Sequence, residues 1–92
     1  MPITFPASIP VSWENPVAAA QGVTAHTVYL DGIVAETVPA PGLSTVVVVA
    51  TPGLHTFEVA AVNPDGEGPK ATALNFVGAP DAPINVTITR LP

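Results

Sequence analysis

Two histidines are the side chains best suited to acid–base or metal chemistry in this 92-residue sequence. The chain has no cysteine, and neither His26 nor His55 has a second histidine at ligand spacing. A zinc site needs three or four such ligands, and a catalytic triad needs a nucleophile, a base and a group that orients the base. No serine lies in an elbow motif. We therefore expect structural roles for both histidines and predict no catalytic residue, no metal site and no cofactor.

Carboxylates occur in two places where they could do chemistry. Asp65 and Glu67 lie in a glycine-rich stretch, but Ca²⁺ takes about six to eight oxygen ligands and this stretch lacks the regular acidic spacing of calcium loops. Asp31 and Glu36 flank a predicted turn, and a carboxylate pair is the machinery of glycosidases. Nothing in the surrounding sequence indicates a concave sugar cleft. We therefore expect ordinary loop, hairpin and surface roles for all four.

The charge balance excludes several classes of partner. The chain has seven acidic residues and two basic ones, Lys70 and Arg90, so its formal net charge is −5. We therefore expect no basic patch for nucleic acid or an anionic membrane. The first residues lack the basic and apolar stretches of a secretory signal. No apolar run approaches the about 20 residues of a membrane span. We therefore expect a complete soluble product that binds neither nucleic acid nor a membrane.

The surface is predicted to be apolar. The chain is 48% hydrophobic and only 10% charged, and its mean hydropathy is +0.49. A domain of this size leaves a large fraction of its residues at the surface, so some apolar side chains must remain outside the core. This favours a protein that works inside an assembly.

Proline and glycine recur at short intervals, and the segments between them predict strands rather than helices. Ile9, Val11 and Trp13 share one parity of the first such segment, which is typical of a strand with one buried face. Trp13 could stack on a sugar, but this parity favours a place in the core, and Tyr29 is the more exposed aromatic. The predicted core includes Trp13, Val28, Phe57 and Val59.

A hairpin is predicted in the first half of the chain. Strands over 26–30 and 33–38 flank Asp31-Gly32, and this dipeptide tolerates the positive φ angles of a two-residue turn.

Three further strands and one loop are expected before the C-terminus. The strand over 44–50 contains Val46 to Val49, which are apolar on both faces. One face must meet the core, and we expect the other to contact a partner, with burial by the protein's own loops as the alternative. Strands over 55–63 and 71–77 follow, separated by an exposed loop over 63–69.

The last predicted strand covers 84–90, after a stiff connector over 78–83. One face of this predicted assembly strand carries Ile84, Val86, Ile88 and Arg90.

Two motifs resemble fibronectin type III domains. Residues 11–16, VSWENP, are similar to the second strand of that family, which commonly ends in a core tryptophan followed by proline. Residues 57–69, FEVAAVNPDGEGP, look like its sixth strand and the following loop. His55 falls where the family usually has the tyrosine of its corner motif, and its ring could hydrogen-bond to the backbone in the same way.

The resemblance spans roughly residues 9–78 and implies an all-β fold. We predict one domain over 1–92, a fibronectin type III/immunoglobulin-like β-sandwich of about seven antiparallel strands. Its core covers 9–78, and a C-terminal linker and strand cover 79–92.

The order of strands departs from the family. Too few residues precede Trp13 for a full first strand, while residues 82–90 look like such a first strand, as if the order were permuted. This strand either closes its own sandwich or pairs with a neighbouring copy by strand addition.

By analogy from fold, we expect a non-catalytic structural protein. The leading interpretation is a bacteriophage capsid decoration or tail-associated protein on the virion, which binds coat subunits or copies of itself as an oligomer or part of a larger assembly. The alternative is an extracellular binding or spacer module of a secreted bacterial enzyme or adhesin.

Overall fold

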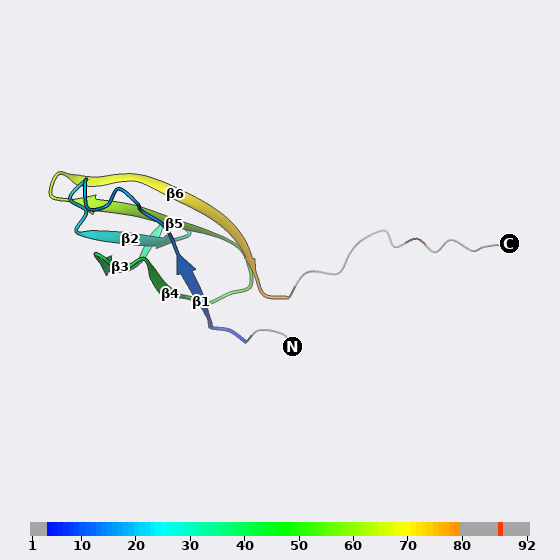
Figure 1. Cartoon of the computed structure of the whole chain (residues 1–92). Coiled ribbons are helices and arrows are strands. Elements are labelled where there is room, and N and C mark those ends of the chain that lie inside the picture. Colours follow the sequence, from blue (N-terminus) through cyan, green and yellow to red (C-terminus); the bar gives the residue numbers. More distant parts are fainter. Residues whose placement is uncertain (1–3, 80–86, 88–92) are drawn as a thin grey trace.

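The structure is a computed structural model that describes residues 4–79 and residue 87, and the described part is all-β (Figure 1). It contains six strands: β1 (Ala7–Ser12), β2 (Ala25–Leu30), β3 (Ile33–Pro39), β4 (Ser44–Val49), β5 (Gly53–Asn63) and β6 (Gly66–Val77). The predicted strand over 84–90 lies outside the described residues except at Thr87, which is not in a strand.

Two antiparallel sheets form the sandwich. One holds β1 and β4, and the other has the order β3-β2-β5-β6. In Figure 1 the four-stranded sheet is seen nearly edge-on, with β4 and β1 below it. The predicted sandwich is confirmed, with six strands in the described part against the about seven expected.

The β2–β3 turn is the predicted hairpin. Asp31 has a φ of 51° and Gly32 a φ of 83°, so both central residues have the positive angles of a type I′ turn. The prediction is confirmed here because the turn chemistry is local and needs no tertiary contact.

The β5–β6 connection corrects the prediction of an exposed loop over 63–69. β6 already begins at Gly66, and the Asp65 backbone N–H donates to Oδ1 of Asn63 (2.9 Å), which closes a tight turn. The ladder continues from Asn63↔Gly66 to Ala60↔Lys70 through a shift in register, because Pro69 has no N–H to pair. Proline and glycine therefore mark a bulge here, not a loop.

Inward-facing residues of both sheets make the core. Val28 and Phe57 belong to the buried cluster, and Trp13 and Val59 pack against it half-buried. The rest of the buried cluster is Ala7, Val47, Val49 and Val77.

Candidate functional site

His55 joins the β2–β3 turn to the segment before β5. Its Nδ1 lies 2.7 Å from Oδ2 of Asp31, and its Nε2 lies 2.7 Å from the carbonyl oxygen of Thr51. The Thr51 carbonyl can only accept, as can an ionised Asp31 carboxylate, so both bonds form together when both ring nitrogens carry a proton. The bond to the Asp31 carboxylate is the main cause of the raised pKa of His55, and the Thr51 carbonyl adds to it. The ring reaches backbone four residues upstream, as expected at the tyrosine-corner position.

Asp31 uses its carboxylate for structure. Oδ1 accepts the backbone N–H of Thr56 (2.9 Å), and the backbone N–H of Asp31 donates to the Thr56 carbonyl (2.8 Å). The Thr56 amide and then the His55 ring lower the pKa of Asp31. Asp31 and Glu36 both border an open hollow between β3 and β4, but most of its lining is apolar. The contacts of Asp31 are those of a side chain that supports its own turn.

His26 is buried beside Trp13. Nδ2 of Asn15 lies 3.1 Å from Nε2 of His26, and the ring centroids of Trp13 and His26 are 5.4 Å apart. If Asn15 donates, Nε2 is the acceptor and the proton lies on Nδ1. Within the described residues, Nδ1 of His26 and Nε1 of Trp13 are buried without a hydrogen-bond partner. His26 thus contributes packing to this end of the sandwich.

Metal binding finds no support in residues 4–79 or at residue 87, where no group of three or more His, Asp or Glu could hold an ion. The described part of the chain also has no helix long and apolar enough to cross a membrane.

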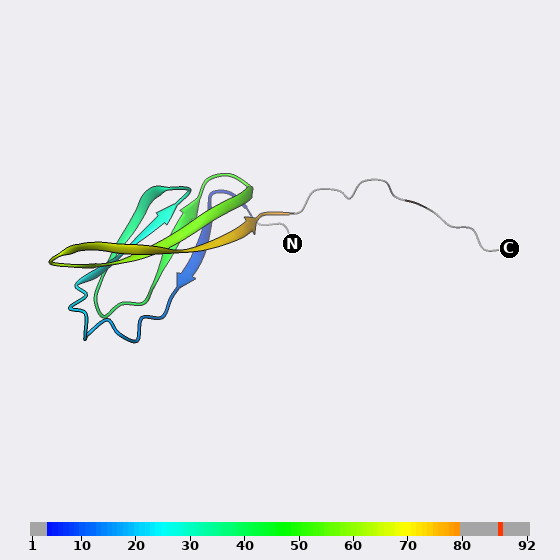
Figure 2. The ribbon, with the colours of Figure 1, turned by 90° about the horizontal axis from the view of Figure 1, so that it is seen from above.

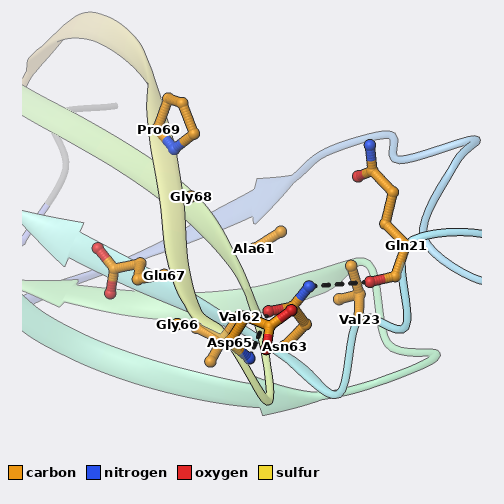
Figure 3. Close-up of a pocket in the computed structure, with 10 residues that line it drawn as sticks. All are labelled: Gln21, Val23, Ala61, Val62, Asn63, Asp65, Gly66, Glu67, Gly68 and Pro69. Carbon is orange, nitrogen blue, oxygen red and sulfur yellow. Dashed lines mark hydrogen bonds between the residues drawn. The ribbon is translucent and has the colours of Figure 1, made fainter.

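Asp65 and Glu67 make different contacts and do not form a joint site. Both carboxylate oxygens of Glu67 accept from the Tyr29 hydroxyl (2.8 and 2.7 Å), so Glu67 is engaged on the outer face of the four-stranded sheet. Asp65 sits at the β5–β6 turn on an open hollow of about 610 Å³, and there the Asn63 side-chain amide donates to the Gln21 carbonyl (3.0 Å; Figure 3). The geometry fits a solvent-facing turn.

A polar cluster covers the centre of this outer face. Nζ of Lys70 lies 4.0 Å from the centroid of the Tyr29 ring, and Thr72 donates a long hydrogen bond to Glu58 (3.4 Å). The Glu67 carboxylate is the largest cause of the raised pKa of Tyr29. The sequence does not predict this cluster. A bulge sets the strand pairing that brings Tyr29 and Lys70 together, and a bulge has no clear sequence signal here.

Exposed apolar side chains lie on β4, in the two-stranded sheet, and on the neighbouring β3. Val47 and Val49 are 2% and 0% exposed, whereas Val46 and Val48 are 53% and 59% exposed, so the loops within residues 4–79 do not cover the outer face of β4. Ile33 and Val34 of β3 are also exposed and line the same hollow as Val46 and Val48.

A second exposed apolar patch lies on the outer face of the four-stranded sheet, at its β5–β6 edge. Leu54 pairs with Phe76 and Thr56 with Leu74, so Leu54, Leu74 and Phe76 share a face, and all three are exposed. Alternation within 71–77 carried the signal for this patch, because Leu74 and Phe76 fall on the parity opposite to the buried Val77.

A groove lies between β1 and β6. It measures about 400 Å³. We call it the β1–β6 groove, and its lining is Ile9, Pro10, Val11, Ser12, Phe57, Ala73, Leu74 and Asn75. The predicted assembly strand, Ile84, Val86, Ile88 and Arg90, lies outside the described residues, so its relation to this groove is a prediction.

Comparison with known proteins supports the fold. A solved structure of the fibronectin(III)-like modules of Clostridium thermocellum CbhA superposes with a TM-score of 0.67 at 14% sequence identity, over 84% of this chain and 84% of that chain. No protein-family model matches the sequence, and no curated protein is similar to it in sequence. The fold is therefore the fibronectin type III-like β-sandwich that the two motifs predicted.

Proposed function

We propose that this chain is a non-catalytic module that acts as a spacer or binding unit in an extracellular bacterial protein. The observation that carries this proposal is the likeness of its sandwich to the fibronectin(III)-like modules of CbhA. The Asp31 carboxylate and both histidines form hydrogen bonds within the turns and core of the chain itself, which supports a non-catalytic role. A function inferred from a shared fold is an analogy, so it needs its own experimental test.

Contact through apolar strand faces would be the mechanism of binding. The exposed side chains of Val46 and Val48 on β4, and of Leu54, Leu74 and Phe76 at the β5–β6 edge, offer two such faces. Burial of apolar surface is the main favourable contribution to most protein–protein association, so either patch is a candidate contact for a neighbouring domain. The net negative charge limits unspecific association.

The finer interpretation as a bacteriophage virion component has the same fold-level basis, and no observation favours it over the module. A protein that decorates a capsid or tail would use the same apolar faces against coat subunits. We therefore place the module first.

The experiment for the spacer role is a distance measurement. The full chain is inserted between two fluorescent proteins, and a glycine-serine linker of equal length is the matched control. A folded spacer gives one narrow distance distribution that salt does not change, while the control gives a broad one. A broad distribution from the chain itself would contradict the spacer role.

Catalysis and binding are tested separately. Glycoside and ester substrates are assayed with the wild type and Asp31→Asn; turnover that Asp31→Asn abolishes would overturn the non-catalytic proposal. Leu54→Ser with Phe76→Ser should leave the spacer distance unchanged and weaken any binding of a neighbouring domain.

A further inference from the structure

We propose that the β1–β6 groove accepts residues 84–90 of a second copy of this chain, which pair antiparallel with β1 and link copies head to tail. This inference deepens the proposed function, since it names a partner of the module. The two fail in different experiments, because the spacer distance does not depend on self-association.

The first observation is that the strands within residues 4–79 leave one side of the sandwich uncovered. The two-stranded sheet is too narrow to cover the whole inner face of the four-stranded sheet. The part left uncovered is at β6. Ala71, Ala73 and Asn75 face inward, because they pair with Val59, Phe57 and His55, yet they are exposed. Small side chains at 71 and 73 leave room for a strand that brings larger ones.

The second observation is the outer edge of β1. The Trp13 backbone N–H donates to the Leu43 carbonyl (3.0 Å), and backbone groups alternate sides along a strand, so those of Ser8, Pro10 and Ser12 point away from β4. Pro10, which has no N–H, therefore lies on the side where proline is tolerated in an edge strand. Among residues 4–79, β1 pairs with β4 alone. The remaining donors and carbonyls of this edge are placed for one more strand.

The third observation fixes the direction of entry. A Cβ at Gly78 would lie 3.3 Å from Cζ of Phe5, so β6 ends where β1 begins. Figures 1 and 2 both place these two chain segments, orange and blue, at the same end of the sandwich. A strand that turned straight from there into its own groove would run parallel to β1, whereas every strand pair in the described part is antiparallel.

The connector over 78–83 is too short for the last strand of the same chain to pair antiparallel with β1. The strand would have to enter at the far end of β1, which is six residues or about 20 Å away at 3.3 Å per residue. The six residues of 78–83, at the about 3.1 Å per residue of a proline-rich segment, span about 19 Å and leave nothing for the reversal. A second copy can enter from the far end without a reversal.

The incoming segment has the required alternation. Ile84, Val86 and Ile88 would face Phe57 and Ala73, and Asn85 and Thr89 would face solvent. The donor and acceptor surfaces differ, so one contact leaves a free donor strand on one copy and a free groove on the other, and further copies can add head to tail.

The test measures the mass of the full chain by light scattering over a concentration series. We expect the mass to rise with concentration from the 9.3 kDa of the monomer past that of a dimer. Val86→Arg should block donation and Ala73→Arg should block the groove, each leaving a monomer. Asn85→Arg and Thr72→Arg place the same charge on the opposite faces and should still associate.

Mixing the two blocked variants gives the sharpest result. Val86→Arg keeps its groove and Ala73→Arg keeps its donor strand, so together they should form one 1:1 heterodimer and no larger species. A wild type that is monomeric at all concentrations would overturn the proposal, as would a mass that stops at a dimer. The wild-type series decides on its own if a variant does not fold, which circular dichroism reports.

Discussion

Nδ1 of His55 lies 2.7 Å from Oδ2 of Asp31, and the same carboxylate accepts the backbone N–H of Thr56. This pairing ties the tip of the β2–β3 hairpin to β5 through charged groups instead of a tyrosine hydroxyl. It makes the corner of this sandwich sensitive to pH.

Stability should fall as pH rises above 6.5, the ordinary pKa of histidine. The folded-state pKa of His55 is raised above its ordinary value of 6.5, so its contribution is complete below 6.5 and is lost as pH rises through the folded-state pKa. The folded-state pKa of Asp31 is lowered below 3.8, so its contribution is present above 3.8 and is lost as pH falls through the folded-state pKa. We expect the highest unfolding temperature between these two ordinary values, measured by calorimetry across pH. A maximum on the alkaline side would contradict the paired imidazolium.

His55→Gln should flatten the alkaline side of that profile. Glutamine can donate to one of the two acceptors but does not titrate, so the fall in unfolding temperature above the ordinary histidine pKa should disappear. His26→Gln is the control, since it removes the other histidine and leaves the Asp31 pair intact. If the slope persists in His55→Gln, another group is responsible.

The sequence predicted elements whose signal is local and missed those set by pairing across the sheet. The Asp31-Gly32 turn follows from two residues that tolerate positive φ, and Val28 and Phe57 follow from alternation. The β5–β6 turn was predicted wrongly, because proline and glycine at a bulge look like a loop unless the ladder is known. The Asp31–His55 pair is 24 residues apart in sequence, so only the folded sheet brings it together.

Val49→Ala and Val48→Ala should differ in stability although they are neighbours. Val49 is fully buried and its truncation leaves a cavity, which should lower the free energy of unfolding by about 2 kcal/mol. Val48 is exposed, so its truncation should change the free energy by less than about 0.5 kcal/mol. Urea denaturation at one protein concentration measures both. Equal losses would mean that the outer face of β4 is covered in solution.

Gly32→Ala should destabilise the hairpin by about 1 kcal/mol, because an alanine at a φ of 83° is strained. No atom lies within 4 Å of the added Cβ, so the loss would come from the backbone and not from a clash. Gly68→Ala is the matched control, since its Cβ would lie in ordinary contact, 3.7 Å from the Ala61 carbonyl oxygen. Denaturation curves of the two variants should therefore separate, and coincident curves would contradict the type I′ turn.

Glu67→Gln should lower the pKa of Tyr29 toward its ordinary value of 10.0. The Glu67 carboxylate accepts a hydrogen bond from the neutral Tyr29 hydroxyl and would repel the phenolate. Both effects oppose ionisation of Tyr29. Tyr29 is the single tyrosine of the chain, and absorbance of the phenolate during an alkaline titration therefore reports this residue alone. Glu58→Gln is the control and should lower the pKa less, because Glu58 acts on Tyr29 only through space and is the smallest of the causes that raise it. A larger effect from Glu58→Gln would mean that the hydroxyl does not bond to Glu67 in solution.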